Sequence, residues 1–317
     1  NNIRPAVPAL IFKPYSARHA EWRHRLQREL PEIEIRLYPE EEGDPEEIEF
    51  ALLWDPPEGM LPRYPNLKAI LSGAAGVDHL LKVPDLPRDV PIARNADPNM
   101  ADTIAEYALC HALSYHRGVR LFQEAQKLGE WLVIPQKATW ERRIGILGFG
   151  VLGQATGKLI AGFGFPVAGW SRRSKDVSGI ESFAGPKGLE PFLARTDILV
   201  CLLPRTPDTE GILDATAFAA MPEGAAVINA ARGEHIVTKD LIAALDSGHL
   251  AGATLDVYAT EPLPAEDPLW RHPMVTMTPH VAGLSAEHTA VPLFVENIRR
   301  ILSGRPMLHL VDLDLGY

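Results

Sequence analysis

A glycine-rich turn near the middle of the chain constrains the fold more than any other feature. Gly148, Gly150 and Gly153 form a GxGxxG pattern, preceded by the apolar run Ile144–Leu147 and followed by the amphipathic segment Gln154–Phe163. In a strand–turn–helix of this kind the first glycine makes the tight turn, the second lets the backbone approach a pyrophosphate, and the third allows close helix–sheet packing. The context predicts a dinucleotide-binding unit, and a glycine-rich connection without a ligand is the alternative.

Apolar runs typical of strands alternate with amphipathic segments along the chain. In the first half these runs are Ala9–Phe12, Ile33–Leu37, Ile48–Trp54, Leu67–Ser72 and Pro91–Arg94. After the glycine-rich turn they are Val167–Trp170, Ile198–Leu203, Ala226–Asn229, Ala253–Val257 and Val275–Thr278. Strands that alternate with helices form parallel sheets. The sequence therefore predicts an α/β fold of two Rossmann-like or flavodoxin-like parallel-sheet domains with a cleft between them.

Three further helices define the expected domain organisation. Ser16 is expected to cap a helix that runs to about Leu30, and a long helix from Ala101 to about Leu128 is expected to link the domains. A last helix, about Ala286–Leu302, is expected to return to the first domain. We therefore predict a substrate-binding lid domain over residues 1–97 and 285–317 and a dinucleotide-binding Rossmann domain over residues 98–284.

The charge balance narrows the range of partners. The chain has 31 Lys and Arg against 41 Asp and Glu, which gives a net charge of −10 at pH 7. Such a chain repels a nucleic-acid backbone or an anionic membrane surface overall, so we expect neither as a partner. A small anionic ligand is still allowed, because it needs only a local cationic pocket.

The cysteine content and the length of the apolar runs bear on the cellular location of the protein. Cys110 and Cys201 are the two cysteines and cannot build a disulfide framework, so we expect a cytoplasmic protein. No apolar run approaches the roughly 18 residues of a membrane span, and no signal-peptide pattern opens the sequence. No closely spaced set of His, Cys and carboxylate residues suggests a metal site.

The segment after the second strand of the dinucleotide-binding unit bears on the choice of cofactor. NAD-preferring folds place an acidic residue there, about 20 residues on, to accept a hydrogen bond from the ribose 2′-hydroxyl. This chain has Ser171, Arg172 and Arg173, a hydroxyl and two guanidinium groups that fit a 2′-phosphate. We therefore predict NADP, with NADPH preferred over NADH. A solvated basic loop, or Asp176 turning inward, is the alternative.

Three polar residues follow strand-like runs in the second half of the chain, and they are candidates for chemistry. These residues are Arg232, Glu261 and His280. In a parallel sheet, ligands bind at the carboxyl ends of strands, so loops that follow different strands can converge on one crevice. Taken singly, each is more commonly an ordinary surface or packed residue. Their joint pattern is what singles them out.

The motifs around these residues carry a family resemblance. In order downstream of the glycine-rich turn they are Ala231-Arg232-Gly233, Leu255-Asp256-Val257, Glu261-Pro262 and Pro279-His280. With them, the sequence closely resembles the D-isomer-specific 2-hydroxyacid dehydrogenases over nearly the whole chain. It is most similar to their bacterial glyoxylate/hydroxypyruvate reductase branch. That similarity rests on Trp54-Asp55-Pro56-Pro57, Trp170-Ser171-Arg172, Pro262-Leu263-Pro264, Pro268-Leu269-Trp270-Arg271-His272-Pro273 and Gly316-Tyr317.

The resemblance implies an NADPH-dependent reductase of small 2-keto acids, converting glyoxylate to glycolate and hydroxypyruvate to D-glycerate. His280 would give a proton to the carbonyl oxygen, since imidazole titrates near neutral pH. Glu261 would hold the other ring nitrogen and favour the protonated form. Arg232 would bind the substrate carboxylate with its planar fork and polarise the carbonyl.

The resemblance also implies binding residues in both domains. For the cofactor these are Val151 and Leu152 in the glycine-rich turn, Leu203, Pro204 and Thr209 beside the adenosine half, and Ala230, Asp256 and Gly283 near the nicotinamide. For the substrate they are the N–H groups of Ala75, Gly76 and Val77, where a plain turn is the alternative, with Trp54 as a wall or as a core residue. A homodimer through the second domain is expected, and Trp131 and Trp140 lie in a loop that in relatives can reach a partner subunit.

Two other functions stay open. One is an NAD-linked dehydrogenase that acts on a larger hydroxy acid. The other is a non-catalytic, dinucleotide-sensing interaction protein, because the family's fold also serves a transcriptional corepressor. The filled catalytic positions argue against pure sensing.

Overall fold

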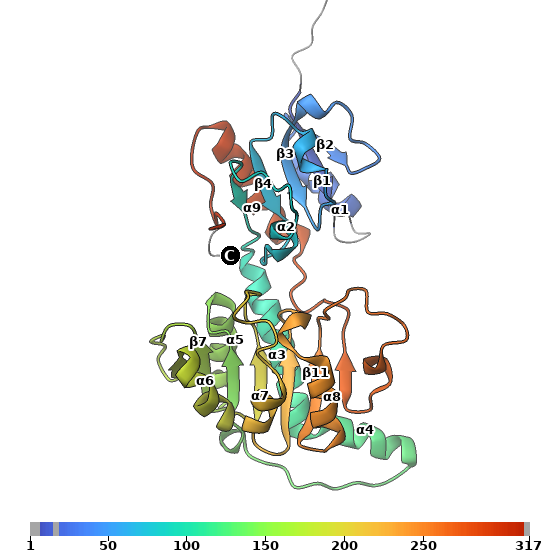
Figure 1. Ribbon diagram of the computed structural model, residues 1–317, viewed down its shortest axis with the longest axis vertical. Coiled ribbons are helices and arrows are strands. Elements are labelled where there is room, and N and C mark those ends of the chain that lie inside the picture. The colour runs from blue at the N-terminus through green and yellow to red at the C-terminus, as the bar shows by residue number, and fades with distance from the viewer. Residues whose placement is uncertain (1–6, 15–18, 314–317) are drawn as a thin grey trace, which may run out of the picture. The chain divides into compact units, whose positions relative to one another are not determined.

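The computed structural model describes residues 7–14 and 19–313. The helix cap expected at Ser16 and the terminal Gly316-Tyr317 lie outside these residues. The chain forms two compact units, one of residues 1–99 together with 285–317 and the other of residues 100–284. Each unit is built on its own parallel sheet (Figure 1).

The first unit has a five-stranded sheet in the order β2-β1-β3-β4-β5, with every pair parallel. Its strands are β1 Ala9–Lys13, β2 Glu34–Leu37, β3 Ile48–Leu53, β4 Ala69–Ser72 and β5 Ile92–Ala93. Its α-helices are α1 His19–Glu29, α2 Asp78–Leu81 and α9 Glu287–Leu302. The core joins distant parts of the chain, because Phe294 and Ile298 of α9 pack with Leu10 of β1 and Leu26 of α1.

The second unit has a seven-stranded parallel sheet in the order β12-β11-β10-β9-β6-β7-β8. Its strands are β6 Ile144–Leu147, β7 Val167–Ser171, β8 Glu181–Ala184, β9 Ile198–Cys201, β10 Ala225–Asn229, β11 Leu250–Leu255 and β12 Val275–Met277. Its α-helices are α3 Pro98–Arg117, α4 Val119–Leu128, α5 Val151–Gly162, α6 Gly185–Ala194, α7 Ala215–Ala220 and α8 Thr238–Asp246. The predicted α/β fold with two parallel sheets is confirmed.

Helices cover both faces of this second sheet, which explains why its strands are apolar throughout. Leu199 and Cys201 of β9 face a core that includes Phe192 of α6. Ile198 and Val200 of the same strand face the opposite core, with residues of α3 and α5. Figure 1 shows α7 and α8 on one side of the sheet and α3 on the other. The strand order reverses between β6 and β9, which is where such folds bind ligands.

Two elements differ from the sequence prediction. The helix expected from Ala101 to Leu128 is wrong as one element, because Gly118 adopts φ +67° and separates α3 from α4. This left-handed backbone ends one helix and starts the next at an angle. The edge strand β8 was not predicted, since Glu181–Ala184 is short and has no buried residue that would show as an apolar run.

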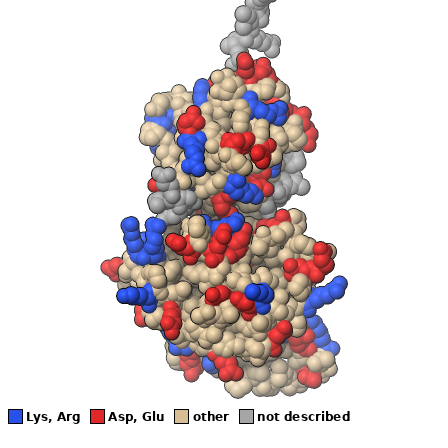
Figure 2. Space-filling model, in the orientation of Figure 1, with Lys and Arg blue, Asp and Glu red and all other residues tan. Residues whose placement is uncertain are grey.

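Two surface properties bear on the partner predictions. In the part of the chain that the structure describes, no helix is both long and apolar enough to cross a membrane. On the face shown in Figure 2, acidic and basic side chains are interspersed among uncharged ones.

Candidate active site

The candidate residues of the second unit leave the sheet at one edge, in two neighbouring groups. Arg232, Glu261 and His280 follow β10, β11 and β12, which are adjacent in the sheet. The proposed cofactor residues follow β6, β7 and β9, which are also adjacent. All these strands are parallel, so their carboxyl ends share one edge and the loops after them lie side by side.

The glycine-rich turn has the geometry that its pattern predicts at two of its three glycines. Gly148 has φ +109°, and a Cβ there would overlap the backbone of Leu202. A Cβ on Gly153 would overlap the carbonyl oxygen of Gly148, so α5 packs directly on the turn. Only glycine is compatible with both positions.

Gly150 differs, because a Cβ on it would meet no described protein atom within 4 Å. Its glycine is therefore not required by contacts within the protein. Gly150 precedes Val151, the first residue of the 12-residue helix α5, whose N-terminal N–H groups favour an anion. Val151 is 75% exposed. The turn thus leaves open space at the place where a pyrophosphate would lie, and its residues fit a dinucleotide.

The basic segment after β7 lies against the glycine-rich turn. The carbonyl oxygen of Trp170 accepts hydrogen bonds from the N–H groups of Gly148 and Phe149, each at 3.0 Å. The Ser171 hydroxyl donates to the carbonyl of Arg173 at 2.7 Å, which curls the segment. The structure therefore brings an exposed, cationic loop beside the proposed pyrophosphate position.

The segment after β9 is shaped by its own hydrogen bonds. Leu202 donates to the carbonyl of Leu147 at 2.7 Å, which ties this segment to the end of β6. Leu203 is buried, and the Thr209 hydroxyl donates to the Pro204 carbonyl at 2.8 Å. Thr209 therefore shapes this loop, and the backbone of Leu202 and Leu203 lies against Gly148 of the glycine-rich turn.

His280 and Glu261 form a hydrogen-bonded pair. The Nδ1 atom of His280 lies 2.7 Å from Oε2 of Glu261, and their side chains are 24% and 29% exposed. The other carboxylate oxygen, Oε1, accepts the N–H of Tyr258 at 2.9 Å. The structure thus holds the Glu261 carboxylate at both oxygens and orients the His280 imidazole through its Nδ1 atom.

The electrostatics of this pair include Arg232. Burial alone would raise the pKa of Glu261, but hydrogen bonds from His280 and Tyr258, with the charges of His280 and Arg232, lower the pKa below its ordinary value. A carboxylate with a lowered pKa stays charged at neutral pH. The Nη1 atom of Arg232 also donates to the carbonyl of Ala231 at 2.7 Å. The charges of His280 and Arg232 therefore both act on the carboxylate of Glu261.

Asp256 organises the loop that carries His280. It is 1% exposed; Oδ1 accepts from the Thr278 hydroxyl at 2.6 Å and from the Val281 N–H at 2.9 Å, and Oδ2 accepts from the Ala282 N–H at 2.9 Å. Its carbonyl accepts the N–H of His280 at 2.8 Å. His280 has φ +55°, a backbone conformation that L-residues seldom adopt unless their surroundings impose it. Asp256 supplies those surroundings.

Two supporting residues are not evident from the sequence. Thr278 donates to Asp256 and is itself hydrogen-bonded at 2.7 Å to the Tyr107 hydroxyl of α3. Tyr258 holds Glu261 through a backbone N–H, a group that every residue except proline has. No residue pattern can signal a backbone donor, and Thr278 is evident only as the end of a strand-like run.

The other two residues expected near the nicotinamide lie at the same edge of the sheet. The Ala230 N–H donates to the carbonyl of Cys201 at 3.3 Å, which links the ends of β10 and β9. A Cβ on Gly283 would come within 3.0 Å of the Ile104 side chain, so Gly283 is in close contact with α3. This contact explains the glycine by packing, and its predicted place beside a cofactor stays a prediction.

In the first unit, the predicted substrate residues follow β3 and β4. Trp54 stacks on His79, with ring centroids 4.6 Å apart, and the Gly73 N–H donates to the carbonyl of Leu53 at 2.9 Å. The Ser72 hydroxyl donates to the Ala74 carbonyl at 2.8 Å. These contacts bring the Trp54 segment beside the small-residue loop.

The loop itself has the features of an anion site. Among the residues that the structure describes, the N–H groups of Ala75, Gly76 and Val77 donate no hydrogen bond to another group. The Val77 side chain is buried, so only its backbone is suited to contact a ligand. Consecutive N–H groups of this kind bind anions in many proteins.

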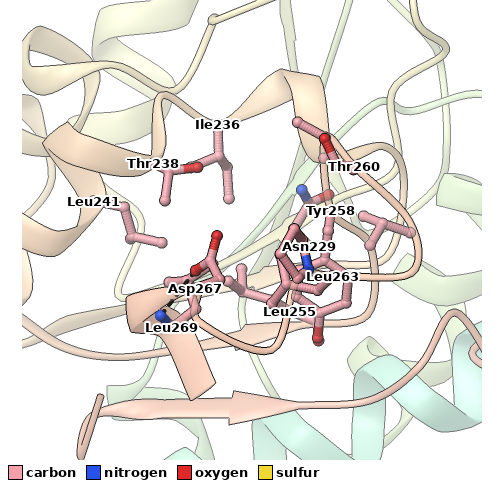
Figure 3. Close-up of a pocket in the computed structure, with 14 residues that line it drawn as sticks. Asn229, Ile236, Thr238, Leu241, Leu255, Tyr258, Thr260, Leu263, Asp267 and Leu269 are labelled. Carbon is pink, nitrogen blue, oxygen red and sulfur yellow. Dashed lines mark hydrogen bonds between the residues drawn. The ribbon is translucent and has the colours of Figure 1, made fainter. Parts of the chain in front are cut away.

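A small pocket in the second unit is lined in part by direct chain neighbours of the candidate catalytic residues, Gly233 and Thr260. It is lined mainly by apolar groups, among them Ile236, Leu241, Leu255 and Leu263 (Figure 3). None of Arg232, Glu261 and His280 lines it. The pocket lies under the segment that carries Glu261, and we do not assign it to the reaction. No cluster of potential metal ligands occurs among the described residues.

Comparisons with known proteins define the class to which this fold and site belong. The model of the "D-isomer specific 2-hydroxyacid dehydrogenase, NAD binding domain" family matches residues 109–282. The glyoxylate/hydroxypyruvate reductase A of Serratia proteamaculans is 41% identical over 302 residues, which cover 94% of this chain and 96% of that protein. The chain therefore belongs to the D-isomer-specific 2-hydroxyacid dehydrogenase family.

Solved structures agree with this membership. A D-isomer specific 2-hydroxyacid dehydrogenase from Xanthobacter autotrophicus Py2, in complex with NADPH and MES, has a TM-score of 0.92 and 43% identity, covering 98% of this chain and 100% of that one. An NADPH-dependent glyoxylate/hydroxypyruvate reductase from Sinorhizobium meliloti, in complex with NADP and sulfate, has a TM-score of 0.90 and 36% identity, covering 98% and 99%. The predicted family is confirmed.

Proposed function

We propose that this protein reduces small 2-keto acids with NADPH, converting glyoxylate to glycolate and hydroxypyruvate to D-glycerate. The observation that supports this proposal is the hydrogen-bonded pair of His280 and Glu261, whose carboxylate also lies within the influence of the Arg232 charge. The three residues lie on loops that follow three adjacent strands. Relatives named glyoxylate/hydroxypyruvate reductase A, similar over 94% of the chain, support the choice of substrates.

The chain's own residues supply the acid and the anion-binding groups of this reaction. When bound, NADPH supplies the hydride. Because Nδ1 of His280 is hydrogen-bonded to Glu261, we assign the proton transfer to the carbonyl oxygen to Nε2. The charged Glu261 accepts the hydrogen bond from Nδ1 and holds the imidazole in place, and the Arg232 guanidinium binds the substrate carboxylate. The product hydroxyl forms when the His280 proton is transferred.

The proposed cofactor residues follow from the open turn and the cationic loop. We propose that the pyrophosphate lies on Gly150, Val151 and Leu152, and that Ser171, Arg172 and Arg173 bind the 2′-phosphate. Leu203, Pro204 and Thr209 would contact the adenosine half, and Ala230, Asp256 and Gly283 the nicotinamide half. The NADPH complex of the Xanthobacter relative supports NADP as the cofactor.

The proposed substrate residues of the first unit are the N–H groups of residues 75–77 and the ring of Trp54. We propose that the N–H groups bind the negative charge of a keto acid. The Trp54 ring, fixed by its stacking on His79, would limit the size of the substrate.

The test is the initial rate of NADPH oxidation, and separately of NADH oxidation, with glyoxylate, hydroxypyruvate, pyruvate and phenylpyruvate. We expect rapid oxidation of NADPH with the first two acids. His280→Asn should lower kcat by about a hundredfold or more, because general acids contribute on this scale, while NADPH binding is retained. The matched control is His272→Asn, since His272 is also paired with a carboxylate, Asp246, at 3.2 Å. Equal rates for wild type and His280→Asn would refute the proton-donor role.

The cofactor preference has its own test. Replacing Arg172 and Arg173 together by alanine should raise KM for NADPH by on the order of a hundredfold and leave KM for NADH nearly unchanged, because only NADPH has the 2′-phosphate. A wild-type preference for NADH would refute this assignment of the two arginines. No turnover with any of the four acids would shift the weight to another substrate or to dinucleotide sensing.

We also propose that the protein is a homodimer formed through the second unit. α4 and the segment after it expose large apolar side chains: Leu121 47%, Phe122 38%, Leu128 71%, Trp131 96%, Val133 79% and Trp140 74%. Exposed large apolar side chains gathered in one part of the chain favour an interaction surface there. Light scattering should give twice the chain mass for wild type, and replacing Leu128 and Trp131 by aspartate should give the monomer mass. A wild-type monomer at micromolar concentration would refute the proposal.

A further inference from the structure

A buried histidine lies three residues beyond Arg232. His235 ends a short 3-10 helix, Gly233–His235, and is 0% exposed. Burying a polar ring is unfavourable unless its nitrogens are hydrogen-bonded. The family motif explains Arg232 and Gly233, and the proposed reaction gives no role to His235.

Both ring nitrogens of His235 meet backbone groups. Nδ1 lies 3.3 Å from the backbone nitrogen of Arg232, and Nε2 lies 3.2 Å from the carbonyl oxygen of Pro204. A backbone N–H can only donate and a carbonyl can only accept. The ring is therefore neutral, with its proton on Nε2, and it connects the Arg232 segment to the segment after β9.

The backbone of Arg232 is fixed on both sides of the residue. Its N–H donates to His235 Nδ1, while its carbonyl accepts the side-chain amide of Asn229 at 2.9 Å. A Cβ on Gly233 would overlap the backbone of Tyr258, so this segment packs directly on the one that leads to Glu261. The direction in which the Arg232 side chain leaves the backbone is set by these contacts.

The Pro204 carbonyl is held by a second hydrogen bond besides that of His235. The Pro204 carbonyl accepts the Thr209 hydroxyl as well as His235 Nε2. Nearby, Arg205 forms an ion pair with Glu234 at 2.7 Å, but that pair is partly exposed. Exposed pairs contribute little and are weakened by salt, so the buried imidazole is the more rigid of the two connections.

We propose that His235 is a positioning residue that acts on both halves of the site. Through Nδ1 it orients Arg232 for the carboxylate of a 2-keto acid, and through Nε2 it sets the Pro204 segment for the adenosine half of NADPH. This inference rests on the proposed function, since it assigns those ligands to Arg232 and Pro204. It adds a residue that touches neither ligand and yet affects the binding of both.

Two amide variants separate the two hydrogen bonds. In His235→Asn the side-chain oxygen lies near the place of Nδ1, so it keeps the bond from Arg232 and is too short to reach Pro204. In His235→Gln the amide nitrogen reaches the place of Nε2 and keeps the bond to Pro204. His235→Leu removes both bonds at similar size. The readouts are KM for glyoxylate and the Kd of NADPH from its fluorescence, with Tm as the control for folding.

We expect opposite patterns from the two amides. His235→Asn should weaken NADPH binding by about tenfold, with KM for glyoxylate within about twofold of wild type. His235→Gln should raise KM for glyoxylate by about tenfold, with NADPH binding within about twofold of wild type. A parallel change of both constants in both variants would overturn the proposal, because a residue that only fills space does not distinguish them. So would a His235→Leu variant that folds and matches wild type in both constants.

One further readout does not depend on turnover. In the protein without ligands, amide hydrogen exchange of the Arg232 N–H should become about tenfold faster in His235→Gln and His235→Leu and stay near wild type in His235→Asn. If wild type reduces no keto acid, the proposed function fails, and this pattern still tests the contact of His235 with Arg232. Equal exchange in all three variants would overturn the inference while wild-type turnover upholds the function.

Discussion

Gly150 and Gly153 lie three residues apart in the same turn and should respond to alanine in opposite ways. A Cβ on Gly153 would overlap the Gly148 carbonyl oxygen, so α5 must move or the turn must distort. Overpacking of this kind costs about 3 kcal/mol, and alanine recovers about 1 kcal/mol in helix propensity. We expect the free energy of unfolding to fall by about 2 kcal/mol. For a unit of this size that is roughly 4–8 °C in Tm.

Gly150→Ala should lower stability less than Gly153→Ala does, and it should weaken cofactor binding. The residue has φ −80° and ψ −154°, which alanine can adopt, and its Cβ meets no described protein atom within 4 Å. The loss of glycine at a helix N-cap costs about 0.5–1 kcal/mol. Because the methyl group would occupy the space of the pyrophosphate, the Kd of NADPH should rise by about tenfold or more.

Thermal unfolding without ligand and fluorescence titration with NADPH measure the two effects in the same preparations. The expected result is a crossed pattern, in which Gly153→Ala has the larger effect on Tm and Gly150→Ala the larger effect on Kd. Wild-type affinity in Gly150→Ala would refute the placement of the pyrophosphate. Wild-type Tm in Gly153→Ala would refute the close contact between helix and turn.

Other predictions concern the second unit. Asp256→Asn should lower the free energy of unfolding by about 3 kcal/mol in urea titrations, because in either orientation the amide must turn its NH₂ toward a backbone N–H, that of Val281 or that of Ala282; a change below about 1 kcal/mol would contradict this. Burial alone would raise the pKa of Asp197, but hydrogen bonds from Arg143 lower it below its ordinary value in the folded protein. Asp197 therefore stabilises the fold at pH values above its ordinary pKa, and this stabilisation is lost as pH falls through the lower pKa of the folded state. Below about pH 4 the Tm of wild type should therefore fall more steeply than that of Asp197→Asn, and parallel curves would contradict it. Gly118→Ala should cost about 1 kcal/mol in the same urea titrations because of its positive φ, and an unchanged midpoint would count against strain there.

The arrangement of the sheets could be predicted from sequence because it depends on patterns that are local in the chain. Apolar runs of four to six residues, separated by amphipathic helices, indicate buried parallel strands wherever they occur. The break at Gly118 could not be predicted from the same pattern, since apolar periodicity continues from α3 into α4. Edge strand β8 lacks the apolar run because only a central strand is covered on both faces.

The sequence predicts those parts of the candidate site that consist of side chains. Arg232, Glu261 and His280 follow strands, so their approach to a common edge follows from the parallel topology. What holds them in place depends largely on backbone groups. The Tyr258 N–H on Glu261 and the two backbone partners of His235 depend on tertiary packing, which one sequence does not display.

The C-terminal helix α9 has a consequence for the order in which the protein forms during synthesis. The second unit is one continuous stretch, residues 100–284, and all of its strands precede α9 in the chain, so they leave the ribosome before α9 does. The first unit begins the chain but lacks Phe294 and Ile298 of its own core until the end. We expect the second unit to fold first on the ribosome, and the first unit to stay incomplete and open to proteases until α9 is released.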